Sequence, residues 1–295
     1  MMEYRTYLHK ENYSKSTIEN YSNHIDLFIK WCKRNHTNPE YIDYNKMLKY
    51  IKYLQRKENT KTTVQKRINI VKNYFKFLMS ENYRADNPIE NVNLKGAKRI
   101  INYNLLEADE LEDLYYSFDT ENYQEEYHKY TSKRNKVIVG LMVYQGLNTT
   151  ELRQLELENL ELYKGKIYIK SGKRSNARML ELKSWQVIEL LEYVKEIREE
   201  IVRRKNVQSE RLFIPNNKRL SNTILAIVKK LKKINHKVNN AHQIRASVIT
   251  NWLGQYNLRK VQYLAGHRYI SSTERYLQDD LENLHEIVNN FHPIS

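Results

Sequence analysis

Apolar residues recur three and four positions apart through residues 16–78, which is the spacing of amphipathic helices. The segment Ser16-Thr17-Ile18-Glu19 has the form of a capping box, so a first helix is predicted to begin there. Its buried stripe is predicted to be Ile18, Tyr21, Ile25, Phe28, Ile29 and Cys32. A second helix is predicted over about 44–56. A third follows Thr62, with the stripe Val64, Ile68, Val71, Phe75 and Leu78.

The helical pattern stops at Asn87-Pro88 and resumes after a basic stretch that contains Gly96. We therefore predict an N-terminal helical domain over 1–94, a linker over 95–103 and a second domain over 104–295. In the second domain, residues 106–111 are predicted to form the start of a helix. The apolar segment 137–144 is predicted to lie in a buried helix. A further helix is predicted over 184–205, with Val187, Leu190, Leu191, Val194, Ile197 and Ile201 facing inward.

One segment of the second domain has the alternation of a strand instead of a helix. Apolar and polar residues alternate on either side of the turn at Gly172-Lys173, within 165–182, which predicts a β-hairpin. The predicted fold class is therefore mainly α with a small β-hairpin or sheet.

Composition indicates a polyanionic partner. The chain has 295 residues, with 50 Lys and Arg against 35 Asp and Glu, a formal charge of +15, and its pI is about 9.5. Residues 1–100 hold 20 of the basic and 10 of the acidic side chains, so two thirds of the excess lies there. This balance suits binding to a polyanion, and thus a nucleic-acid partner.

Candidate DNA contacts are the cations and threonines that cluster where the second predicted helix ends and the third begins, together with the basic linker. Such groups suit phosphate contacts at a helix start, although an ordinary solvated face has the same composition. The predicted DNA-binding residues are Arg56, Lys57, Lys61, Thr62, Thr63, Lys66, Arg67, Lys72, Lys95, Lys98 and Arg99.

Cys32 is the single cysteine. It excludes an internal disulfide and a cysteine-rich zinc site, and it suits a reducing compartment. No apolar run approaches the roughly 18 residues of a membrane span, and the first residues lack the apolar core of a signal peptide. We expect a soluble, cytoplasmic protein with no membrane partner.

The candidate chemistry lies in the last quarter of the chain. His242 and Arg245 are three residues apart, so on a helix both leave the same face and can reach one anion. The pair Gly266-His267 follows, and Tyr276 comes nine residues after His267, across a short polar connection that suits a mobile nucleophile.

This order, with the box Leu264-Ala265-Gly266-His267, resembles the tyrosine recombinase (phage integrase) family. The resemblance implies a small helical core-binding domain ahead of a catalytic domain. It also implies a site-specific recombinase or integrase that cleaves and rejoins DNA through a covalent 3′-phosphotyrosine. Such chemistry needs neither a cofactor nor a metal.

The resemblance also implies a role for each candidate residue. Tyr276 would attack the phosphodiester, while Arg245 and His267 stabilise the charge that builds on the phosphate. His242 would orient the phosphate or accept the tyrosine proton. Lys173, which matches the lysine of the family's hairpin, would protonate the leaving 5′ hydroxyl, and Glu151 would orient its neighbours.

At one position the chain departs from the family pattern. Asn148 follows Gly146-Leu147, where the family has its first catalytic arginine. Asparagine offers one neutral donor in place of a charged fork, so transition-state stabilisation is expected to suffer unless another cation substitutes. Arg153 points roughly 140° away on a shared helix. Arg174 and Arg178, in or just after the hairpin turn, are the better candidates, and Arg174 is preferred.

After Tyr276, an amphipathic tail helix is predicted over 279–291. Resemblance to the family suggests that it docks into a neighbouring subunit, as part of a dimer or a cyclic tetramer assembled on an inverted-repeat DNA target. Packing against its own domain fits the pattern equally well.

Two other functions stay open. Loss of the first arginine would suit a catalytically weakened architectural or regulatory DNA-binding protein. A type IB topoisomerase-like enzyme shares the chemistry but lacks strand exchange between duplexes. Neither the target sequence nor the role follows from the residues, because integration of a mobile element, excision, inversion and dimer resolution use the same motifs.

Overall fold

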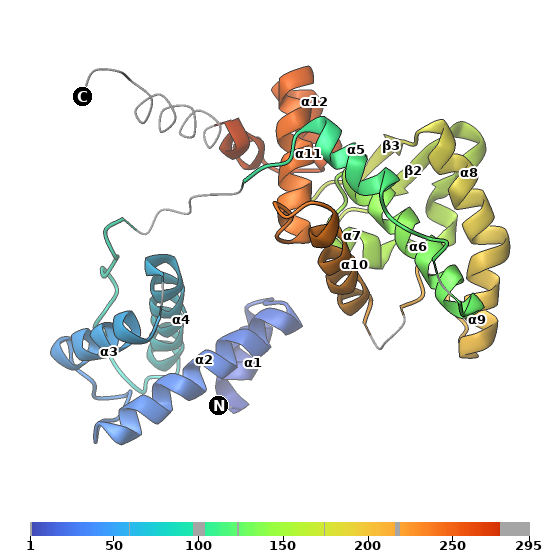
Figure 1. The fold of residues 1–295 in the computed structure, drawn as a ribbon. Coiled ribbons are helices and arrows are strands. Elements are labelled where there is room, and N and C mark those ends of the chain that lie inside the picture. Colours follow the sequence, from blue (N-terminus) through green and yellow to red (C-terminus); the bar gives the residue numbers. More distant parts are fainter. Residues whose placement is uncertain are drawn as a thin grey trace, which may run out of the picture. The chain divides into compact units, whose positions relative to one another are not determined.

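The protein is mainly helical with a small antiparallel sheet, as predicted (Figure 1). The computed structural model describes residues 2–58, 60–96, 104–122, 124–173, 175–215 and 219–277. The chain separates into two compact units, Met1–Ile100 and Ile101–Ser295. The predicted tail helix over 279–291 lies outside the described residues. None of the described helices is both long enough and apolar enough to span a membrane.

The first unit contains four described helices around one apolar core. They are α1 (Met2–Lys10), α2 (Lys15–Arg34), α3 (Tyr44–Lys57) and α4 (Lys61–Ser80). The two predicted stripes lie in this core: all five stripe residues of α4 are buried, while Tyr21 and Ile29 of α2 are only partly buried. Cys32 is fully buried among them, and burial raises the pKa of its thiol to about 12.

The predicted start of α2 is wrong by two residues. Ser14 is the N-cap, because its backbone is extended and its side chain accepts a hydrogen bond from the Thr17 N–H at 3.3 Å. Ser16 already lies within the first turn. Ser14 and Ser16 are both suitable N-cap residues, so the sequence alone does not show which one caps the helix. The extended backbone at Ser14 identifies it as the N-cap.

The second unit is built around the buried helix α6. Its helices are α5 (Ala108–Tyr116), α6 (Glu126–Val143), α7 (Thr149–Gln154), α8 (Ser184–Glu192), α9 (Arg198–Lys205), α10 (Leu220–Ile234), α11 (Ala241–Gln255) and α12 (Leu258–Ala265), with short 3₁₀ turns at Leu157–Asn159 and Leu162–Lys164. Figure 1 shows α6 running through the middle of the unit, where it contacts α5, α8, α9 and α11. Residues 137–143, predicted as a buried helical segment, lie within α6 and are buried.

The predicted hairpin is present as part of a three-stranded antiparallel sheet. The strands β1 (Leu160–Glu161), β2 (Lys166–Ile169) and β3 (Arg178–Glu181) lie in that order. In the hairpin, Lys166 pairs with Glu181 and Ile169 with Arg178. Because β3 also contacts α12, the sheet lies next to the Gly266-His267 turn that ends that helix.

The helix predicted over 184–205 is interrupted by one π turn, Tyr193–Ile197, between α8 and α9. Leu190 and Leu191 lie about 100° apart around the helix ahead of this turn, so the two cannot face the core equally. Tyr193 is fully buried, whereas Leu191, predicted to face inward, has 42% of its surface exposed. Leu190, Ile197 and Ile201 are buried as predicted.

Candidate active site

Glu151 lies at the centre of the candidate site and is placed by the start of α7. The Asn148 side-chain oxygen accepts hydrogen bonds from the N–H groups of Thr150, at 2.9 Å, and Glu151, at 3.0 Å. In return, Glu151 Oε2 accepts from the Asn148 N–H at 3.0 Å, which completes a capping box. Asn148 therefore caps a helix at the position where the first catalytic arginine was expected.

The Glu151 carboxylate joins two arginines that come from distant parts of the chain. Its Oε1 lies 2.8 Å from Arg178 Nη1, and its Oε2 lies 2.9 Å from Arg245 Nη1. The side chains of Glu151, Arg178 and Arg245 are 5%, 0% and 8% exposed, so this is a buried ion triad. Burial opposes ionisation of Glu151, but Arg245 and Arg178 outweigh it and hold the pKa of the carboxyl below its usual value.

Arg245 is further fixed by two backbone carbonyls. Its Nη1 donates to Gly146 O and its Nη2 donates to Ala265 O, both at 2.6 Å. These bonds connect α11 to the turn before α7 and to the end of α12. The guanidinium is thus held rigidly between the Gly146-Leu147 turn and the Gly266-His267 turn.

Arg178 lies just after the hairpin turn, as predicted, but its side chain is buried in the interior. It begins β3, its Nε donates to Leu264 O at 2.7 Å, and its guanidinium lies against Gly266. A Cβ placed on Gly266 would meet Arg178 Nη1 at 2.3 Å. Nη2 is buried and has no hydrogen-bond partner among the described residues. Arg174, the preferred substitute, lies outside the described residues.

His267 and Tyr276 lie together beside this triad. Their rings stack with centroids 5.9 Å apart and planes 8° apart. Tyr276 is 8% exposed, and residues 271–277 have helical backbone. Burial, with Arg245 and Arg178 nearby, lowers the pKa of His267 to about 4, so its imidazole is neutral at neutral pH.

Thr273 is a residue of this site that the sequence did not reveal. Its Oγ1 lies 2.9 Å from Nδ1 of His267, and its side chain is fully buried. Thr273 precedes Tyr276 by three residues, so both can lie on one helical face. That spacing was the available signal, but a threonine in a polar segment does not stand out.

His242 and Lys173 are exposed, in contrast to the triad. His242 is in the first turn of α11, and although Arg245 is one turn further on, only Arg245 is buried. Lys173 is in the hairpin turn, where its carbonyl accepts from Arg268 at 3.4 Å. The Asn176 N–H donates to Gly266 O at 2.9 Å, which ties the hairpin end to the turn that carries His267.

The predicted DNA-binding residues of the first unit lie around the α3–α4 connection. Arg56 and Lys57 end α3, and Lys61 begins α4, where Thr60 is the N-cap. The hydroxyls of Thr62 and Thr63 contact Thr60 Oγ1 at 3.2 and 2.8 Å.

Most of the cations in this group are exposed. Lys66 and Lys95 are exposed, and Lys72 is partly buried. Arg67 forms a 2.9 Å ion pair with Glu58. Lys98 and Arg99 lie outside the described residues.

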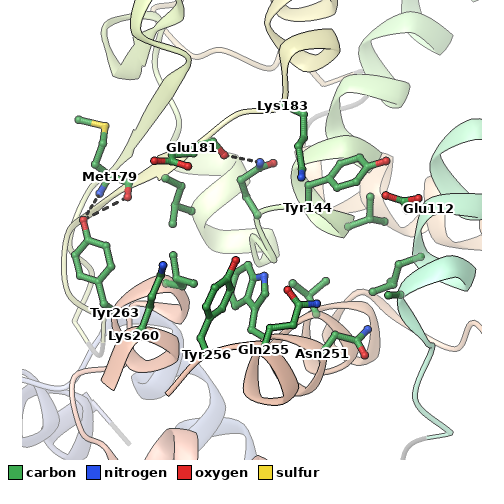
Figure 2. A pocket seen from close by; sticks show the side chains of 18 of the residues that line it. Glu112, Tyr144, Met179, Glu181, Lys183, Asn251, Gln255, Tyr256, Lys260 and Tyr263 are labelled. Carbon is green, nitrogen blue, oxygen red and sulfur yellow. Dashed lines mark hydrogen bonds between the residues drawn. The ribbon is translucent and has the colours of Figure 1, made fainter. Parts of the chain in front are cut away.

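A pocket of about 530 Å³ lies between β3 and the helices α11 and α12. Figure 2 shows Tyr263 of α12 reaching across to Met179 of β3, where its hydroxyl is 3.1 Å from the Met179 N–H and 3.3 Å from the carbonyl. None of the candidate catalytic residues that the structure describes lines this pocket. Its Tyr263 contact instead holds α12 against the strand that begins with Arg178.

Known proteins resemble this chain over nearly its whole length. It is 27% identical to tyrosine recombinase XerC of Thermodesulfovibrio yellowstonii over 289 residues, covering 96% of this chain and 92% of the relative. It is 25% identical to tyrosine recombinase XerD of Listeria innocua over 289 residues, covering 95% and 93%.

Solved structures share the fold. XerH recombinase bound to palindromic difH substrate in a post-cleavage complex matches with a TM-score of 0.72 and 19% identity, over 94% of this chain and 80% of that one. A lambda integrase dimer bound to a COC′ core site matches with a TM-score of 0.64 and 14% identity, over 92% of each chain.

Two family profiles match in the order that the two units follow. The phage integrase N-terminal SAM-like domain matches residues 1–82, and the phage integrase family itself matches residues 104–283. The second match alone covers more than half of the chain. The chain therefore belongs to the phage integrase family of tyrosine recombinases.

Proposed function

We propose that this site-specific recombinase cleaves and rejoins duplex DNA through a covalent bond between Tyr276 and the 3′ phosphate. Family membership supports the enzyme class. The observation that supports the residue assignment is the stack of Tyr276 on His267, 5.9 Å between centroids, beside the ion triad that holds Arg245. A phenol, an imidazole and a fixed guanidinium are the groups that phosphoryl transfer to a hydroxyl nucleophile needs.

In the proposed reaction the Tyr276 oxygen attacks phosphorus and the bond to the 5′ oxygen breaks. The phenolic proton goes to His242, and Lys173 donates a proton to the leaving 5′ oxygen. Charge that builds on the non-bridging oxygens is stabilised by Arg245 and His267. Religation runs the same steps backward, so the energy of the phosphodiester is retained and the step consumes no nucleotide.

We propose that Arg178 supplies the second positive charge, which the family's first arginine would provide at the position that Asn148 occupies here. Two guanidinium groups share the single Glu151 carboxylate, so the triad has an excess positive charge. Arg178 also has a buried N–H group without a partner among the described residues, and it lies against the glycine next to His267. A fixed charge in a buried site acts on a transition state more strongly than one in water.

Arg178 and Arg174 can be separated in one cleavage assay. If Arg178 supplies the charge, Arg178→Lys lowers the cleavage rate at least tenfold while Arg174→Ala changes it little, because lysine lacks the planar fork. Thermal melting of both variants checks that they fold. The reverse result assigns the role to Arg174. Unchanged cleavage in both variants would show that neither arginine replaces the missing one.

The DNA partner is supported by two DNA-bound structures that share this fold, XerH recombinase and lambda integrase. We propose an inverted-repeat target, bound by a dimer that assembles into a cyclic tetramer during strand exchange. We also propose that the basic residues of the first unit, from Arg56 to Lys72, contact DNA phosphates. The affinity for DNA should then fall steeply as the salt concentration rises. Binding releases salt cations that are condensed on the DNA, and this release is less favourable at high salt.

The decisive experiment traps the covalent intermediate. A nicked suicide duplex, made from DNA that flanks the gene, is incubated with the protein and resolved by denaturing electrophoresis. The wild type is expected to form a phosphotyrosyl adduct and Tyr276→Phe none. Tyr269→Phe is the matched control, because Tyr269 is in the same segment but 67% exposed. An adduct that survives in Tyr276→Phe would assign the nucleophile to another residue.

The same assay tests the architectural alternative, which the capping role of Asn148 favours. That side chain is committed to the start of α7 and contributes no charge. Specific DNA binding without any adduct, on nicked and intact duplexes alike, would identify a binding protein. Adducts spread over unrelated sequences would instead indicate a type IB topoisomerase-like activity.

A further inference from the structure

Among the described residues, the His267 imidazole has a hydrogen-bond contact at one of its two nitrogens. Nδ1 lies 2.9 Å from Thr273 Oγ1, so Nε2 is the nitrogen left to meet a substrate. Thr273 is itself held firmly: its side chain has no exposed surface, and its N–H donates to Ile270 O at 2.7 Å. Thr273 therefore fixes the orientation of the ring.

The hydroxyl of Thr273 also decides where the imidazole proton lies. A neutral imidazole carries one N–H, and the hydrogen bond at one nitrogen determines whether that N–H is on the other. The hydroxyl is buried, and among the described residues its only hydrogen-bond contact is Nδ1. A buried hydroxyl proton needs an acceptor, so the hydroxyl donates and Nδ1 accepts.

The charges around His267 favour the same arrangement. Arg245, Arg178 and Arg275 all act on this imidazole, and Glu151 is the carboxylate that acts on it. The surroundings thus suit an anion, which a donor nitrogen attracts and an acceptor lone pair repels. An Nε2–H group matches a phosphate oxygen, whereas a bare Nε2 does not.

We propose that Thr273 is a positioning residue, which donates its hydroxyl proton to Nδ1 of His267 and so keeps the imidazole proton on Nε2 for donation to a DNA phosphate oxygen. This inference rests on the proposed function, in which His267 stabilises the attacked phosphate. It adds a residue and a tautomer to that function. Because Thr273 and Tyr276 share one helical turn, the same segment sets the histidine proton and carries the nucleophile.

The tautomer can be read directly in the free protein. The sequence has nine histidines, so the His267 signals in ¹⁵N–¹H correlation spectra are assigned by comparison with His267→Gln. The wild type is expected to show the Nε2–H tautomer. In Thr273→Val, which keeps the shape and removes the hydroxyl, the two tautomers should mix, and Thr273→Ser should restore the wild-type pattern. An Nδ1–H tautomer in the wild type overturns the proposal.

Cleavage rates provide the second readout. In single-turnover assays on the suicide duplex, Thr273→Val is expected to lose about 100-fold in rate, the typical cost of one misplaced oxyanion donor. DNA affinity should be unchanged, and Thr273→Ser should stay within a few-fold of the wild type. Equal rates for the serine and valine variants would contradict the proposal.

A double variant separates positioning from simple loss of structure. If Thr273 acts only through His267, then Thr273→Val has no further effect on cleavage in a His267→Gln background. A further loss there would indicate a general structural role and overturn the inference. If the wild type forms no adduct, the proposed function is wrong. The ¹⁵N–¹H spectra of His267 would still show which nitrogen carries the proton, so the role of Thr273 is tested separately.

Discussion

The candidate site has an interior half and a surface half, and the two differ in what holds them. Glu151, Arg178 and Arg245 form a buried triad, each fixed by at least two contacts from separate elements. His242 and Lys173 are exposed, on a first helical turn and a hairpin turn. The interior groups are placed before any substrate arrives, whereas the surface groups meet solvent until DNA covers them.

This difference implies that the interior groups serve both folding and chemistry. A charge buried in an ion triad is costly to leave unpaired, so removing one partner should destabilise the fold. An exposed side chain can be changed with little effect on stability. The free energy of unfolding should therefore separate the two halves.

Glu151→Gln should cause the largest loss. It leaves two buried arginines without a carboxylate, and breaking a buried ion pair costs about 3–5 kcal/mol. Urea unfolding followed by circular dichroism measures the change. The control is Glu161→Gln, because Glu161 pairs with Lys164 at the surface and should lose less than about 1 kcal/mol. Similar losses for both variants would remove the distinction between interior and surface.

Gly266→Ala should cost about 2–4 kcal/mol, since it combines a left-handed backbone with overpacking. Gly266 has φ +68°, and a Cβ would press on the Arg178 guanidinium, which Glu151 and Leu264 hold in place. Gly254→Ala is the matched control, as nothing lies within 4 Å of its added Cβ. It lies inside α11, so alanine there should slightly stabilise the helix. A harmless Gly266→Ala would show that Arg178 moves freely.

Acid should weaken the interior half through His267. The folded pKa is about 4 and thus below that of the unfolded chain, so between pH 6.5 and 4 the unfolded state takes up the proton first. Stability is consequently unaffected above that window and falls as the pH drops through it, by about 2 kcal/mol at pH 5. Unfolding of wild type and His267→Gln at pH 7 and pH 5 measures it. The variant should lose less stability than the wild type.

His242→Gln should change stability least, by less than about 0.5 kcal/mol, because His242 is exposed. Cleavage should nevertheless fall about 100-fold if His242 accepts the tyrosine proton. Paired unfolding and single-turnover measurements test both expectations on one variant. A large loss of stability without a loss of cleavage rate would show that His242 supports the fold and takes no part in the reaction.

Periodicity predicted the helices and the hairpin because burial of one face determines them locally. The stripe of α4 from Val64 to Leu78 is confirmed by burial of every member. The π turn at Tyr193–Ile197, which contacts α6, was not predictable, because the apolar spacing of residues 184–205 is that of one continuous helix. Sequence placed His267 and Tyr276 in order along the chain, but it gave no sign that Thr273 contacts His267.

The sequence also did not predict that Arg178 is buried, and this has a physical cause. An arginine in a polar hairpin is expected at the surface, because a lone guanidinium is costly to bury. Arg178 lies inside because Glu151, 27 residues earlier, neutralises it and Leu264 O accepts from its Nε. A long-range ion pair of this kind leaves no local trace in the sequence.

The buried Cys32 gives the protein a built-in reporter of the first unit. An exposed thiolate attacks a thiol reagent, but this sulfur is enclosed in the core, so labelling requires that core to open. The chain has no second cysteine to confuse the signal. The labelling rate therefore measures opening of the first unit alone, and comparing it with circular dichroism of the whole chain shows whether the two units melt together or one by one.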